Sequence, residues 1–125
     1  MNALHAPLSL VARIFMAAIF IQAGAGKIPG YAGTQAYMAK SGVPGELLPL
    51  VIALEIAGGV AILVGLYARL AGLALALFTI AAAVMFHSEV GDRMQLIHFM
   101  KNVAIAGGLL LLAANGPGRI AVNDR

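Results

Sequence analysis

Four long apolar stretches alternate with short polar segments along the chain. The apolar stretches cover about residues 8–26, 43–66, 70–86 and 96–114. Each is close to the roughly 20 residues that an α-helix needs to cross about 30 Å of hydrocarbon. The pattern therefore predicts an all-α, polytopic membrane protein, in which a single domain over residues 1–125 forms a bundle of four transmembrane helices.

The polar segments between these stretches differ in length. In the connector at residues 31–42, the central residues 34–40 can form two helical turns at the membrane surface, and an ordered loop is the alternative. Residues 65–69 allow only a tight turn, so the second and third predicted helices are antiparallel neighbours. A second polar loop covers residues 87–95.

The composition makes the lipid bilayer the expected environment. Hydrophobic residues account for 62% of the 125 residues and charged residues for 10%, whereas soluble domains average about 25% charged residues. The mean hydropathy of +0.95 agrees with this difference. The Lys and Arg residues are scattered and form no basic patch, so we expect no nucleic-acid partner. Because the chain has no cysteine, it cannot itself provide thiolate or iron–sulfur chemistry.

Four spans place both termini on the same side of the membrane. The charges near the helix ends are evenly divided between the two sides, and Arg13 in the first helix adds to the terminal side. We therefore predict cytoplasmic termini. The residues compared are Arg69, Arg119 and Arg125 on the terminal side, and Lys27, Lys40 and Arg93 on the opposite side.

Two short patterns recur in the two halves of the chain. An Ala-Arg pair opens the first apolar stretch at residues 12–13 and the third at residues 68–69. The sequence Ile-Ala-Gly-Gly occurs in the second stretch at residues 56–59 and in the fourth at residues 105–108. This recurrence favours two parallel helical-hairpin repeats related by an axis along the membrane normal. Coincidence is the alternative, because the repeated residues are small and common.

Polar side chains from all four predicted helices gather in the half of the bundle next to the two polar loops. A rise of about 1.5 Å per residue places Glu55 roughly 12–15 Å from that surface and Lys101 roughly 7–9 Å from it. A lone carboxylate inside a membrane span is costly, so Glu55 should have a partner. The cluster consists of Gln22, Glu55, His87, Lys101 and Asn102.

Lys101 is the expected ion-pair partner of Glu55, because its long side chain can bridge the difference in depth. Arg13 is the second candidate. At about 100° per residue, Gln22 points almost opposite to Arg13, so Arg13 is favoured over Gln22 for the bundle interior. The pair can serve a purely structural role that fixes the register between helices, or it can mark a ligand or proton site.

His87 and His98 lie at the two ends of the second polar loop, where their side chains can meet. Two histidines could hold a metal ion or a haem. Without cysteine or a nearby carboxylate, however, two histidines are a weak metal signature, and interfacial histidines are far more common. We therefore predict no metal site.

Taken together, the motifs resemble those of the DoxX family of small four-helix bacterial inner-membrane proteins, and the resemblance covers essentially the whole chain. Gln22 departs from the family pattern, which favours an apolar or aromatic residue there, and the tail is a loose version of the family's ending. The matching features are Arg13, Gly24-x-x-Lys27, Tyr37, Gly42-x-Pro44, Glu55-Ile56-Ala57-Gly58-Gly59, Gly65-Leu66-x-x-Arg69, His87, Lys101-Asn102 and Gly116-Pro117-Gly118-Arg119.

The resemblance implies an inner-membrane location and, more loosely, quinone-linked redox chemistry. Relatives include a membrane subunit of a thiosulfate:quinone oxidoreductase and a component of a membrane complex linked to thiol and superoxide stress. The leading hypothesis is therefore an oxidoreductase subunit that binds a quinone or similar lipophilic ligand, with the redox centre on a partner subunit. The predicted catalytic residues are Glu55, Lys101 and His87, and the predicted ligand-binding residues are Arg13, Lys27, Asn102, His98 and Gln22.

Two further hypotheses belong to other classes. A small oligomeric membrane transporter, built as a homo-oligomer, fits the repeat and the charges within the bundle. A non-catalytic scaffold or assembly factor fits a structural ion pair.

Overall fold

The computed structural model describes residues 2–87, 89 and 91–125, and these residues form helices and turns without a strand. By length and hydropathy, four segments can cross a membrane, which confirms the all-α, four-span prediction: Ala3–Gly26, Gly45–Val64, Ala68–Phe86 and Arg93–Asn115. The helices are α1 (Asn2–Gly26), α2 (Tyr31–Lys40), α3 (Leu48–Val64), α4 (Ala68–Phe86) and α5 (Arg93–Asn115), with a short 3-10 turn, η1 (Gly45–Leu47), before α3.

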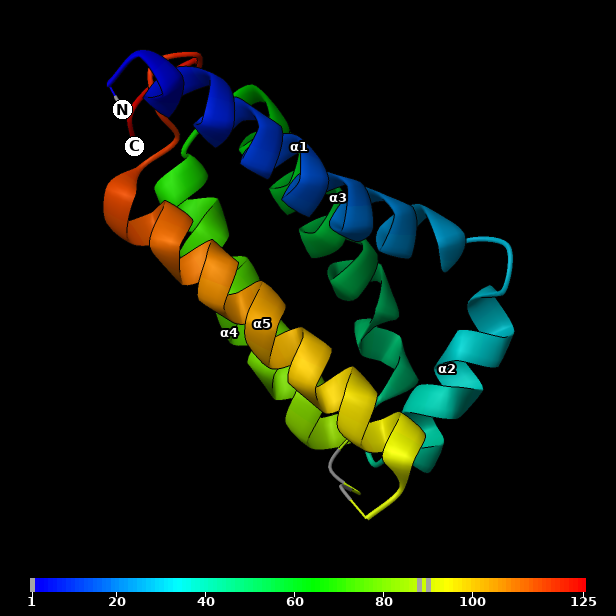
Figure 1. Ribbon diagram of the computed structural model, residues 1–125. Helices are drawn as coiled ribbons and strands as arrows, with labels where there is room; N and C mark the ends of the chain where they lie inside the picture. Colours follow the sequence, from blue (N-terminus) through cyan, green and yellow to red (C-terminus); the bar gives the residue numbers. More distant parts are fainter. Residues whose placement is uncertain (1, 88, 90) are drawn as a thin grey trace.

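The four long helices form two antiparallel pairs, α1 with α3 and α4 with α5 (Figure 1). At the end of the molecule that holds both chain termini, α1 lies close to α4 and α5, and it diverges from them toward the other end, where α2 lies (Figure 1). The core contains Ile62, Leu75 and Leu109, which are fully buried. Large apolar side chains such as Phe15 and Leu77 cover the outer surface, as expected for helices that face lipid.

Two helices begin earlier than the apolar stretches indicate. The first helix starts at Asn2 and includes Pro7 in its second turn, where the proline removes one backbone hydrogen bond. The last helix starts at Arg93 because Asp92 caps it: the Asp92 Oδ1 accepts hydrogen bonds from the backbone N–H groups of Met94, at 2.9 Å, and Gln95, at 3.4 Å. An aspartate three residues before a glutamine is a recognisable start signal.

Replacing Asp92 by alanine should lower the free energy of unfolding by about 1 kcal/mol, because two backbone donors at the start of α5 lose their acceptor. Denaturant titration of the detergent-solubilised protein measures this change. Asp92→Asn is the matched control, since asparagine caps helices equally well. Equal destabilisation by both substitutions would contradict the capping role.

Glycines allow α1 and α3 to cross closely around the buried Glu55. A Cβ atom at Gly59 would lie 2.8 Å from Ile21 Cγ1 of α1, and a Cβ atom at Gly24 would lie 2.7 Å from Ile56 Cγ1 and 3.2 Å from Glu55 Cβ. Small residues at such positions are typical of helix packing in membranes. The close crossing therefore brings the end of α1 within reach of Glu55.

The recurring Ala-Arg pairs occupy equivalent positions in the two helix pairs. Arg13 of α1 donates from Nη1 to the backbone carbonyls of Ile62 and Leu63 at the C-terminal end of α3, both at 3.1 Å. Arg69 of α4 donates in the same way to the carbonyl of Ala114 at the C-terminal end of α5, at 2.9 Å. In each pair, a cation on the first helix satisfies unpaired carbonyls of the second helix and complements its dipole. This equivalence supports the predicted hairpin repeat.

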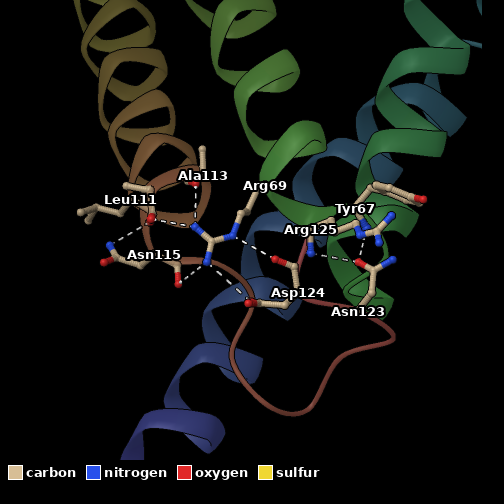
Figure 2. Close-up of polar contacts among 9 residues, drawn as sticks. Tyr67, Arg69, Leu111, Ala113, Asn115, Asn123, Asp124 and Arg125 are labelled. Atoms are coloured by element: carbon tan, nitrogen blue, oxygen red, sulfur yellow. Dashed lines mark hydrogen bonds and ion pairs between the residues drawn. The ribbon is translucent and has the colours of Figure 1, made fainter.

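The C-terminal segment after α5 folds back over these helix ends. Arg13 Nη2 also donates to the carbonyl of Ile120, and the Arg69 Nε donates to the carbonyl of Asp124 at 3.0 Å. Figure 2 shows Arg69 between the last turn of α5 and the tail, with Asn123 bound to the backbone N–H of Tyr67. Gly65 has a φ of 75°, and a side chain there would overlap Ala121 of the tail. The tail thus ties both helix pairs together at the terminal end.

Candidate functional site

A largely apolar cavity of about 420 Å³ lies between the two helix pairs, and α2 contributes to its wall. All four long helices line the cavity, and its volume lies in the range of small-molecule sites. Most lining residues are aliphatic or aromatic. The polar lining residues are Lys27, Thr34, Tyr37, Glu55, Thr79 and Asn102.

Glu55 forms an ion pair with Lys27 at the wall of this cavity. The Lys27 Nζ lies 2.6 Å from the Glu55 Oε1 and 3.3 Å from the carbonyl of Ala23, so it donates to both. The Glu55 side chain is 5% exposed and the Lys27 side chain 28% exposed. The pair therefore joins the end of α1 to the middle of α3 and places a carboxylate and an ammonium group beside an apolar space.

The predicted Glu55–Lys101 ion pair is wrong, because Glu55 pairs with Lys27 and Lys101 is exposed on the outside of α5. The helix phase explains the error. Asn102 and Ala106 belong to the inward face of α5, and Lys101 lies about 100° around the helix from Asn102. Adjacent residues cannot both point into the bundle, and the packing of α5 against α4 selects Asn102.

The alternative Arg13–Glu55 pair is wrong as well, although Arg13 is buried as expected. Arg13 is 1% exposed and binds carbonyls at the opposite end of α3 from the cavity. Gln22 is exposed on the outer side of α1 and does not line the cavity, in agreement with its expected direction opposite to Arg13. These two predicted ligand-binding residues therefore do not contribute to the cavity wall.

Thr79 and Asn102 form a second polar group at the cavity, on the α4–α5 pair. The Asn102 Nδ2 donates to the backbone carbonyl of Thr79 at 3.3 Å, which holds the amide at the wall. Thr79 is 4% exposed, and its hydroxyl has no hydrogen-bond partner among the described residues. A buried hydroxyl without a partner is uncommon and costs free energy. Asn102 was predicted as a ligand-binding residue, whereas Thr79 was not among the predicted site residues.

His87 and His98 meet at the end of α4, outside the cavity wall. Their ring centroids are 5.0 Å apart, and the His87 Nδ1 lies 2.9 Å from the Gln95 Oε1. Within the described residues, no group of three or more His, Asp or Glu side chains is arranged to hold a metal ion. The histidines are therefore brought together as predicted, but at the rim and not beside Glu55.

A second cavity of about 520 Å³ adjoins the first and has a more polar wall. Tyr37 of α2 and Phe86 of α4 line both cavities, and their rings stack with centroids 5.3 Å apart. The second cavity also contacts Lys40 and Gln95. An aromatic pair thus separates an apolar space from a polar one.

The sequence pattern contained a signal for Lys27 and for the helical turns at residues 34–40, which belong to α2, but none for the role of α2 as a cavity wall. Arg13, Gly24 and Lys27 share one side of α1 at about 100° per residue, so Lys27 lies on the face that packs against α3. The role of α2 as a cavity wall depends on long-range packing of Met38, which is 5% exposed, and Tyr37. Local sequence cannot report such packing.

Comparison with known proteins gives one family and two close relatives. The DoxX family model matches residues 8–88. The chain is 54% identical to inner membrane protein YqjF of Escherichia coli over 114 residues, covering 91% of this chain and 88% of that protein. It is 38% identical to inner membrane protein YphA of Escherichia coli over 125 residues, covering 94% and 89% of the two chains. No solved structure gives a significant match.

Proposed function

The chain belongs to the DoxX family of multi-pass inner-membrane proteins, and from this premise we propose that it binds a lipophilic carrier, with a quinone as the favoured ligand. The observation that carries the proposal is the Lys27–Glu55 ion pair at the wall of a mostly apolar cavity. An intramembrane ion pair beside a cavity is typical of ligand or proton sites. In this scheme the chain is the membrane subunit of an oxidoreductase.

Quinone reduction requires two electrons and two protons for each quinol formed. The Lys27 ammonium can donate a hydrogen bond to a quinone oxygen, and Glu55 can exchange a proton with Lys27 across 2.6 Å. His87 contacts Gln95, which lines the second cavity, so His87 can hold that side chain at the wall. The electrons come from a redox centre on a partner subunit, because this chain has no cysteine to hold an iron–sulfur cluster.

Quinone binding to the purified protein should depend on the ion pair. The double variant Lys27→Met with Glu55→Leu should bind decylubiquinone at least about tenfold more weakly than the wild type, because both polar partners at the cavity wall are lost. Equilibrium binding in detergent micelles, followed by quenching of tyrosine fluorescence, measures the affinity. The protein has three Tyr and no Trp, and Tyr37 lines the cavity.

Lys101→Met is the matched control, because it also removes one membrane lysine but from the outside of α5. It should leave the affinity unchanged. Equal affinity of the double variant and the wild type would reject the proposed site and would favour a scaffold. Ion or solute flux in proteoliposomes that depends on Glu55 would favour the transporter.

A further inference from the structure

We infer that the cavity selects a ligand whose head group carries two separate polar atoms, one met by the Lys27–Glu55 pair and the other by Thr79 and Asn102. This inference rests on the proposed function and specifies the ligand more closely. A ring with two opposed oxygen atoms, such as a para-quinone, fits the requirement, whereas a fatty alcohol or a simple phenol offers one polar atom.

The two polar groups of the cavity come from different helix pairs. Lys27 and Glu55 belong to the α1–α3 side, while Thr79 and Asn102 belong to α4 and α5. In Figure 1, α1 diverges from α4 and α5 toward the α2 end, and the cavity is lined by all four long helices. A ligand lying between the pairs can therefore meet one polar group on each side.

The unsatisfied Thr79 hydroxyl is the observation that points to a ligand. Threonine in a helix usually donates to a backbone carbonyl one turn earlier, but the Thr79 Oγ1 has no partner among the described residues. Threonine has two accessible χ1 rotamers in a helix, and rotation exchanges the positions of its hydroxyl and methyl groups. Because Thr79 lines the cavity, rotation can present the hydroxyl to a bound oxygen atom.

Asn102 supports the same interaction. Its Nδ2 is already held by the Thr79 carbonyl at 3.3 Å, so the amide is oriented at the wall. A side-chain amide has two N–H donors and one carbonyl acceptor. A second N–H group of Asn102 therefore remains for the same ligand atom that Thr79 binds.

The test compares two probes with the same ten-carbon tail, decylubiquinone and 4-decylphenol. Thr79→Val should weaken decylubiquinone binding about five- to tenfold, since one net hydrogen bond is lost, and should leave 4-decylphenol binding unchanged. The same substitution should raise the thermal midpoint of the ligand-free protein, because it removes a buried hydroxyl that has no partner. A purely structural threonine would not combine higher stability with weaker binding of only one probe.

The controls separate this inference from the proposed function. Thr79→Ser keeps the hydroxyl and should retain quinone affinity, and Asn102→Leu should reproduce the probe-selective loss. If Thr79→Val weakens both probes equally or neither, the inference is overturned, although quinone binding that depends on Lys27 and Glu55 would still stand. If the wild type does not bind decylubiquinone, the proposed function itself fails.

Discussion

Replacing Arg13 by methionine should lower the free energy of unfolding by about 3 kcal/mol. Arg13 is 1% exposed, and its guanidinium donates to the carbonyls of Ile62, Leu63 and Ile120. Methionine fills a similar volume but donates no hydrogen bond, so three carbonyls lose a donor whose side chain is almost fully buried. Equilibrium unfolding of the solubilised protein measures the loss.

Two controls show whether burial and geometry cause this effect. Arg69 makes the equivalent contacts in the second helix pair, but its side chain is 37% exposed, so Arg69→Met should cost only about 1 kcal/mol because water replaces the lost donors. Arg13→Lys should fall between methionine and arginine, since a single ammonium cannot reach acceptors on both α3 and the tail. Equal losses for Arg13→Met and Arg69→Met would contradict the explanation.

The apolar pattern predicts the four spans for two reasons. Bilayer thickness fixes the length of a span, and each helix pairs its own backbone N–H and C=O groups in hydrogen bonds. The recurrence of the Ala-Arg pair predicts that the two helix pairs are equivalent. The contacts of Arg13 with the end of α3 and of Arg69 with the end of α5 support this prediction. The choice of partner for Glu55 could not be predicted from depth alone. It depends on helix phase, which places Lys101 outside, and on the close crossing at Gly24.

The site breaks the symmetry of the two helix pairs. The recurring sequence motifs place Ala83 and Ala104 in the second pair where Lys27 and Glu55 stand in the first. Each helix pair therefore has its own arginine that binds carbonyls at a helix end, Arg13 in one and Arg69 in the other. The ion pair of Lys27 with Glu55 exists in only one of the two helix pairs. A feature that serves only to stabilise a helix pair would be useful in both, so the presence of the ion pair in one of them, at the cavity wall, supports a role in binding.

Removing Lys27 alone should be more harmful than removing both members of the ion pair. Lys27→Met leaves the Glu55 carboxylate, whose side chain is 5% exposed, without a counter-ion, and should cost about 3 kcal/mol of stability. Glu55→Leu should cost less, about 1 kcal/mol, because Lys27 lies at the end of α1 and can turn toward the interface. The double variant should lie within about 1 kcal/mol of the wild type, since two well-packed apolar side chains replace a buried pair at little cost.

A double-mutant cycle of unfolding free energies measures this coupling, and additive losses would contradict a direct interaction between Lys27 and Glu55. The same cycle distinguishes the structural role of the pair from its functional role. A double variant that is as stable as the wild type but binds decylubiquinone poorly has lost only the chemistry of the two side chains. A double variant that keeps both stability and binding would reject a role of the pair in binding and leave only the structural role of joining α1 to α3.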